Sequence, residues 1–143
     1  MYVATSRLRP PSTRSHKVID ARTHGLIDYC HATVFLGMAL LCRKSNPRAA
    51  TAALLTGSFV LAESLLTDYP LGVAKVFSFA THGRMDAALA ASSPLLPRLF
   101  GFKGTAAARV FQANCLVACS VVGLTDFDSR RACHGDSPLP CHQ

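Results

Sequence analysis

Two short stretches of the sequence carry the same pair of potential metal ligands. Residues 23–29 read THGLIDY and residues 81–87 read THGRMDA, so in each stretch a His is followed four positions later by an Asp. Imidazole nitrogens and carboxylate oxygens bind divalent metals, and they also form charge-assisted hydrogen bonds with one another. Side chains four positions apart share one face of an α-helix. Each stretch therefore predicts a His/Asp pair on one helical face.

The two stretches are related by a constant shift of 58 residues, from His24 to His82. Without any gap, the same shift maps the segment LTDY at 66–69 onto LTDF at 124–127. A match at both ends of a unit is typical of an internal duplication. We therefore predict two tandem copies of one helical hairpin, residues 23–69 and 81–127.

Four largely apolar segments must position these residues, and each holds 18–20 residues: 24–42, 49–66, 82–100 and 105–124. A helix of that length covers about 27–30 Å, close to the thickness of the bilayer hydrocarbon. Only 16% of the chain is charged, against about 25% in ordinary soluble domains. The sequence predicts an all-α fold, a four-transmembrane-helix bundle built from two tandem helical-hairpin repeats, multi-pass in the cell membrane. A soluble four-helix protein with unusually apolar helices is the alternative.

Two spans per copy give both copies the same orientation, so both copies begin and end at one membrane face. Six ionisable side chains are expected to gather at that face: His24, Asp28, Asp68, His82, Asp86 and Asp126. Ionisable residues within spans are costly and usually face the interior of a bundle. Glu63 should therefore converge on the same pocket, although its counterpart in the second copy is Val121.

The rest of the chain is predicted to form two tails and a linker. Residues 1–22 form a basic, disordered N-terminal tail and residues 128–143 a C-terminal tail, while the largely apolar residues 70–80 form an interfacial linker. The formal net charge of +7 would ordinarily suggest nucleic acid as a partner. Basic residues on a tail beside membrane spans instead anchor to anionic headgroups.

The expected partners follow from this distribution of charge. We expect the lipid bilayer, and a homo-oligomer or a larger membrane complex, but no nucleic acid. Basic residues are slightly more numerous on the side of the two termini. By the positive-inside rule this excess favours cytoplasmic termini.

Three motifs resemble a known family: HGLIDY at 24–29, LTDYPLGVAK at 66–75 and SSPLLPRLFGF at 92–102. They are similar to the SPW-repeat family of small multi-pass bacterial membrane proteins, over residues 23–127. The chain has Ser93 and Pro94, but Leu95 stands where that family carries its Trp. The resemblance implies a membrane location and no established activity.

The simplest interpretation of the polar residues is a structural latch that fixes the bundle. Thr23 and Thr81 are suitable helix N-caps. The two His side chains would form hydrogen bonds with Asp68 or Asp126. Asp28 and Asp86 would lie in the first helical turn, where the helix dipole favours an anion.

Two further interpretations remain open. The His and Asp residues could hold zinc, iron or manganese, as in carboxylate-rich metal centres of helical bundles, although the spacing here is His-x-x-x-Asp instead of Glu-x-x-His. An enzyme, if there is one, would act at that pocket. Alternatively, Glu63 could carry protons or ions through the membrane. The sequence names neither a reaction nor a ligand.

Overall fold

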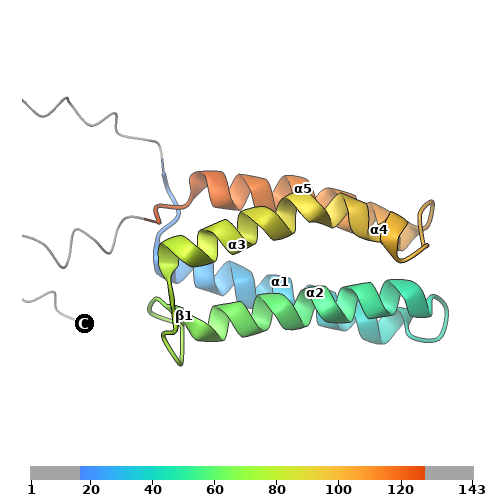
Figure 1. Ribbon diagram of the computed structural model, residues 1–143, viewed down its shortest axis with the longest axis horizontal. Coiled ribbons are helices and arrows are strands. Elements are labelled where there is room, and N and C mark those ends of the chain that lie inside the picture. The colour runs from blue at the N-terminus through green and yellow to red at the C-terminus, as the bar shows by residue number, and fades with distance from the viewer. Residues whose placement is uncertain (1–16, 128–143) are drawn as a thin grey trace, which may run out of the picture.

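The computed structural model describes residues 17–127 as an elongated bundle of helical rods (Figure 1). The elements in chain order are α1 (Ala21–Cys42), α2 (Pro47–Leu66), β1 (Thr67–Asp68), β2 (Phe77–Ser78), α3 (Phe79–Ser92), the 3₁₀-helix η1 (Ser93–Leu95), α4 (Leu96–Leu99) and α5 (Ala106–Leu124). The predicted mostly helical fold is confirmed. Three helices within the described residues, α1, α2 and α5, are long and apolar enough to cross a membrane. The predicted tails lie outside the described residues, except for residues 17–22.

The helices pair as two hairpins that lie side by side (Figure 1). Helix α1 packs along α2, and α3 with η1 packs along α5. The single helix predicted over 82–100 is interrupted at Ser93–Leu95, because Pro94 has no N–H to continue the helical hydrogen bonds. Helix α1 has no proline at the corresponding positions and runs unbroken to Cys42.

Helices α1 and α3 begin at side-chain caps three residues earlier than predicted. Asp20 Oδ1 accepts hydrogen bonds from the backbone N–H groups of Arg22 and Thr23, at 3.0 and 2.8 Å. Ser78 Oγ accepts from the N–H of Thr81 at 3.1 Å. The assignment of Thr23 and Thr81 as N-caps is therefore wrong, since both lie inside a helix whose first turn is already capped.

Replacement of Asp20 by Ala should lower the free energy of unfolding by about 1 kcal/mol, because the cap is lost. The backbone hydrogen bond from Thr23 lowers the pKa of Asp20 below its ordinary value. The carboxylate cap therefore contributes fully above about pH 4, the pKa of an unfolded Asp, and its contribution is lost as pH falls through the lower folded pKa. Thermal unfolding at several pH values measures both effects. Asp20→Asn is the control, because it keeps an uncharged cap; equal losses in both variants would contradict the role of the cap.

Aromatic side chains and alanines fill the bundle at the end where the α1–α2 and α4–α5 connections lie. The ring centroid of Phe111 lies 5.0 Å from that of Phe35 and 5.5 Å from that of Phe102, and all three side chains are buried. Alanines of α2 are buried against them: Ala49, Ala52 and Ala53. Small residues of this kind let helices approach closely, as in membrane bundles.

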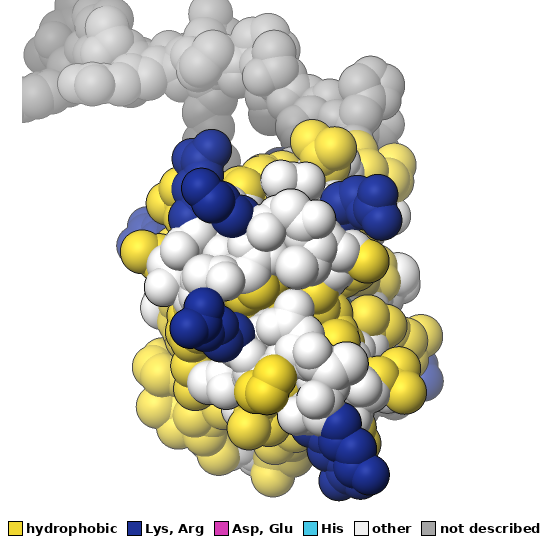
Figure 2. All heavy atoms as spheres, turned by 90° about the vertical axis from the view of Figure 1, so that its right-hand side faces the viewer, with side chains coloured by type: hydrophobic (Ala, Val, Ile, Leu, Met, Phe, Trp, Pro, Cys, Tyr) yellow, Lys and Arg dark blue, Asp and Glu magenta, His cyan; other side chains and the backbone are white. Residues whose placement is uncertain are grey.

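The outer surface of this end is basic. Figure 2 looks onto it and shows separate Lys and Arg side chains between apolar ones. The exposed cations of the two connections and their flanks are Arg43, Lys44, Arg48, Arg98 and Lys103. These cations suit a headgroup region. The cytoplasmic position of the termini stays a prediction.

The opposite end carries two short parallel backbone pairings. Strand β1 pairs with β2 through Thr67 and Phe77, and Ile19 pairs with Thr125. A shift of 58 residues converts one pairing into the other, since Ile19 becomes Phe77 and Thr67 becomes Thr125. The predicted linker, residues 70–80, holds a connection, strand β2 and the first two residues of α3, so it ends earlier than predicted; Val73 in the connection is 75% exposed. Their contact with the membrane interface stays a prediction.

Candidate metal centre

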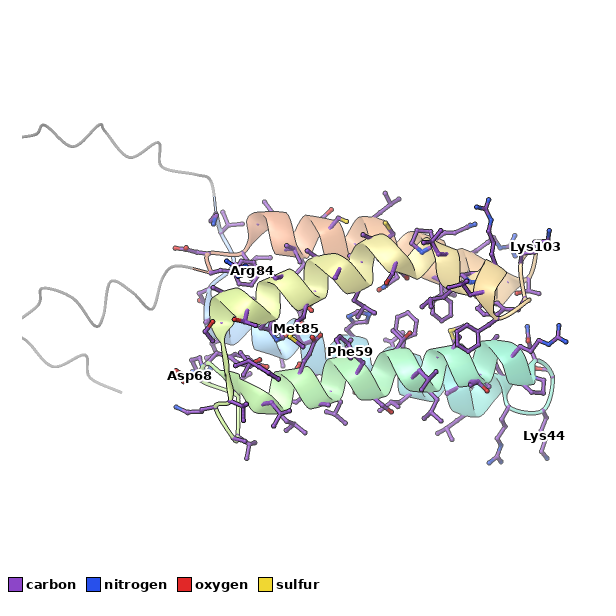
Figure 3. The ribbon with its side chains drawn as sticks, viewed as in Figure 1. Lys44, Phe59, Asp68, Arg84, Met85 and Lys103 are labelled. Carbon is purple, nitrogen blue, oxygen red and sulfur yellow. The ribbon has the colours of Figure 1, made fainter. Side chains whose placement is uncertain are left out.

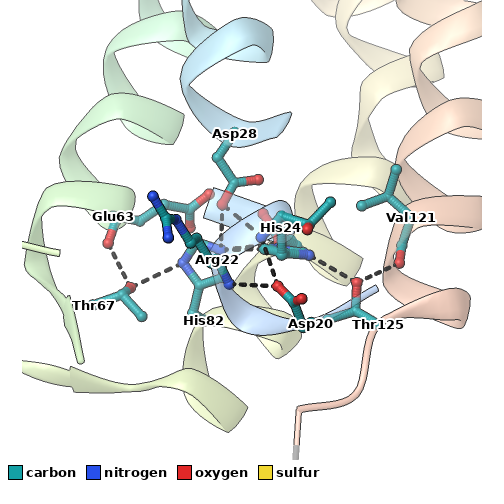
Figure 4. Close-up of polar contacts among 11 residues, drawn as sticks. Asp20, Arg22, His24, Asp28, Glu63, Thr67, His82, Val121 and Thr125 are labelled. Atoms are coloured by element: carbon teal, nitrogen blue, oxygen red, sulfur yellow. Dashed lines mark hydrogen bonds and ion pairs between the residues drawn. The ribbon is translucent and has the colours of Figure 1, made fainter. Parts of the chain in front are cut away.

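Four ionisable side chains meet between α1 and α3 near the paired strands. His24 and Asp28 come from α1, and His82 and Asp86 come from α3, one helical turn apart in each case. Both imidazoles are fully buried, and the two aspartates are 4% and 8% exposed. One ligating atom from each residue lies within 4.8 Å of all the others. Figure 4 shows His24 and His82 converging below Asp28.

The Nε2 atoms of the two His residues lie close to each other and to the Oδ2 atoms of both aspartates. His24 Nε2 lies 3.2 Å from His82 Nε2, 2.9 Å from Asp86 Oδ2 and 3.5 Å from Asp28 Oδ2. His82 Nε2 lies 3.1 Å from each of the two Oδ2 atoms. Zinc–ligand bonds of about 2.0–2.2 Å place tetrahedral ligand atoms about 3.3–3.6 Å apart. The five distances of 2.9–3.5 Å are therefore close to, and slightly shorter than, the spacing of ligand atoms around a small divalent ion.

Two threonines determine which ring nitrogen of each His carries a proton. Thr125 Oγ1 lies 2.8 Å from His24 Nδ1, and Thr67 Oγ1 lies 2.9 Å from His82 Nδ1. Each hydroxyl donates its single hydrogen to the backbone carbonyl four residues earlier, at 2.7 and 2.6 Å respectively. A hydroxyl has only one hydrogen to donate, so each Nδ1 must donate its own hydrogen to the threonine.

This arrangement leaves the two Nε2 atoms to face each other at the centre. In neutral His24 and His82 each Nε2 carries a lone pair, and two lone pairs 3.2 Å apart repel unless a proton or a metal ion lies between them. Two carboxylates add two negative charges, which a divalent cation balances. A hydrogen bond on the outer ring nitrogen is also the usual way in which metal-binding His residues are oriented. The donor set therefore fits a divalent metal.

Glu63 of α2 lies beside the four residues, as its place in the second apolar segment predicts (Figure 4). Its side chain is 2% exposed, and neither carboxylate oxygen has a hydrogen-bond partner of good geometry within residues 17–127. The group is near enough to Asp86, His82 and Asp28 to interact with their charges. A buried acid in that position is costly, and a bound ion or water is a common reason for one.

Aromatic rings cover the centre at the strand end of the bundle. The ring centroids of Phe79 and Phe127 lie 5.4 and 5.3 Å from that of His24, and Tyr69 lies 5.8 Å from His82. Tyr69 and Phe79 are buried. These rings shield the imidazoles from water on that side.

No family model, curated protein or solved structure matches this chain. The SPW-repeat resemblance stays a prediction, and the chemistry of the site is inferred from its own atoms.

Asp68 and Asp126 lie outside the cluster, in contrast to the prediction. Asp68 is half exposed and forms an ion pair with Lys75 at 3.5 Å, and the backbone N–H of Asp126 donates to the carbonyl of Ile19 at 3.0 Å. Neither belongs to the group of four ligands. Side chains alternate between the two sides of an extended backbone, so the inward position falls to the residue just before each Asp.

That preceding residue is Thr67 after α2 and Thr125 after α5, and both are fully buried. The structure assigns to them the hydrogen bonds that the sequence had suggested for the aspartates. The threonines are duplicated by the same shift as the His residues, which is the sequence feature that could have identified them. The sequence suggested the aspartates instead because an Asp is the more familiar partner of His.

Proposed function

We propose that this chain is a membrane protein that binds one divalent transition metal through His24, Asp28, His82 and Asp86. The strongest support is the close set of two Nε2 and two Oδ2 atoms, which all lie within 4.8 Å of one another. The Nδ1 atoms of both His residues already donate hydrogen bonds to threonine hydroxyls, which leaves both Nε2 atoms to bind the metal. Two nitrogen and two oxygen donors suit zinc. Glu63 supplies a further oxygen for iron or manganese, or a base beside a metal-bound water.

We further propose that the two hairpins cross the membrane as a four-helix bundle. The labelled charged side chains lie at its two ends, with Asp68 and Arg84 at one and Lys44 and Lys103 at the other (Figure 3). Large apolar side chains between them are exposed, among them Leu40, Leu54, Phe59, Leu116 and Val117. Such a surface is costly in water and is expected where helices face lipid. The rod of α3, η1 and α4 would be the fourth span.

The paired contacts support an origin by tandem duplication. Helices α1 and α3 begin at Ala21 and Phe79, and α2 and α5 end at Leu66 and Leu124. Both pairs differ by 58 positions. The centre then lies on the axis between the two copies, and each copy supplies one His, one Asp and the threonine that orients the His of the other copy.

Elemental analysis of the protein purified in detergent tests the metal directly. We expect close to one divalent ion per chain. A folded, monodisperse protein without metal would overturn the proposal and would leave the cluster as a structural latch. Oligomeric state is measured on the same sample, since a homo-oligomer or a larger complex stays a prediction.

Loss of the threonine hydroxyls should weaken metal binding without removing a ligand. In Thr67→Val and Thr125→Val, the isosteric side chain no longer accepts the Nδ1–H hydrogen bond. Loss of such an outer partner commonly costs 10–100-fold in metal affinity. Competition with a chromogenic chelator measures the change. Thr67→Ser keeps the hydroxyl and is the matched control, and equal affinity of Thr67→Val and wild type would contradict the orienting role.

A further inference from the structure

A cavity of about 350 Å³ lies against the proposed metal centre, between α1, α3 and α5. Asp28 and Asp86 belong to its lining, so the cavity reaches the ligand set itself. No described residue of α2, the helix that carries Glu63, belongs to its lining. The centre is therefore flanked by an acid on one side and by an accessible space on the other.

The difference between the two sides follows from one departure from the repeat. The counterpart of Glu63 is Val121 on α5, which lines the cavity. The shorter, apolar Val121 does not extend to the ligands as Glu63 does. The cavity therefore lies on the α5 side of the centre, in the place that corresponds to the Glu63 carboxyl group on the α2 side.

The cavity is long, narrow and mostly apolar. Its lining on α5 extends from Val110 to Val122, which corresponds to about 18 Å along a helix. Its side chains on α1 extend from Ile27 to Phe35. We refer to this space as the slot. Its shape suits an alkyl chain better than a compact ring system.

The polar groups of the slot lie at and near the metal centre. His31 Nε2 on α1 is buried and has no hydrogen-bond partner of good geometry within the described residues, and Asn114 lies on α5. Both residues line the cavity, as do the two aspartates. An unpaired buried nitrogen beside an apolar space is what a ligand with one polar group would satisfy.

The rim of the slot lies between two helices that are candidate membrane spans. Cys30 and Val34 of α1 and Val117 of α5 line the slot and are also exposed, the two valines at 59% and 61%. Within a bilayer this rim would face lipid. A ligand would therefore enter from the membrane, in which alkyl chains dissolve.

We propose that the slot binds a membrane-dissolved molecule with one alkyl chain and a hydroxyl or carbonyl head. The chain lies between α1 and α5, and the head lies at His31 and the metal centre. The contact of the head with the metal rests on the function proposed above, whereas the chain site and the His31 contact do not. The ligand class of the centre is thus a single-chain amphiphile.

Protection of Cys30 from alkylation tests this proposal, because Cys30 lies at the rim of the slot. The probe is octanohydroxamic acid, which joins an alkyl chain to a metal-binding oxygen head, and acetohydroxamic acid is the same head without the chain. Full-length protein is treated with N-ethylmaleimide, and labelling at each cysteine is followed by mass spectrometry. Cys119 is exposed on α5 outside the slot and serves as the internal control.

We expect octanohydroxamate to protect Cys30 at a concentration at least about tenfold below that of acetohydroxamate, because each buried methylene adds affinity. Labelling of Cys119 should not change. Ala118→Phe, which fills the slot, should abolish the advantage of the longer probe, whereas Leu116→Phe on the outer face of α5 should keep it. Equal protection by the two probes, or equal slowing at Cys119, would overturn the proposal.

The metal content of each sample separates this proposal from the proposed function. Selective protection of Cys30 in a protein that contains no metal would support the slot and overturn the metal centre. Bound metal without selective protection of Cys30 would support the metal centre and overturn the slot. Retained metal in Ala118→Phe confirms that its loss of protection comes from the filled slot and not from misfolding.

Discussion

The double variant His24→Ala/His82→Ala is expected to lose essentially all bound metal, whereas the wild-type protein keeps close to one divalent ion per chain. The two substitutions remove both Nε2 ligands and also the Nδ1 contacts to Thr125 and Thr67. Only the carboxylates of Asp28, Asp86 and Glu63 then remain, and without imidazole ligands the site suits zinc or iron poorly. Elemental analysis of detergent-purified, monodisperse protein measures the loss.

The matched control for this variant is Asp68→Asn/Asp126→Asn. These two residues are also related by the 58-residue shift, but they lie outside the ligand group. Their replacement should leave the metal content unchanged. A chelator should lower the melting temperature of wild type and of this control, and it should not change that of the double His variant. Metal retained by the double His variant would show that the ion binds elsewhere.

Gly25→Ala should destabilise the fold by about 3 kcal/mol, at the upper end of what one extra methyl group costs in a packed site. A Cβ on Gly25 would overlap the ring of Tyr69, which is fully buried and contacts the ring of His82. The ring cannot move outward without leaving its stacked position on Phe79. The second copy repeats the contact, since a Cβ on Gly83 would lie 2.6 Å from Phe127.

Gly37→Ala is the control for this prediction. Gly37 lies in the same helix, and no described atom outside its own backbone lies within 4 Å of an added Cβ. Because Ala is the better helix former, this change should be neutral or stabilising by up to about 1 kcal/mol. Denaturant unfolding in mixed micelles, followed by circular dichroism, compares the two. Similar stability of both variants would mean that Tyr69 does not pack against Gly25 as described.

Much of the helical architecture is readable from the sequence. The apolar runs and the prolines place the helices to within a few residues, and the constant shift from His24 to His82 relates the two hairpins. The His-x-x-x-Asp spacing is also informative alone, because residues four apart share a helical face whatever the rest of the chain does. Each His of the centre lies one turn from its own Asp for this reason. The break at Pro94 follows from the missing N–H, which the apolar pattern alone does not reveal.

Other features depend on how the two hairpins pack together. Thr125 contacts His24 although the two residues are 101 positions apart in the sequence. Thr125 and not Asp126 makes this contact because the Thr125 side of the short extended segment faces inward. The slot exists because Val121 lies opposite Glu63 across the centre, a relation between different helices. Periodicity is a local property of the backbone, so the sequence alone determined the helices and the two His/Asp pairs. Tertiary packing decided which partners those pairs meet, because contacts between distant segments depend on the relative position of whole helices.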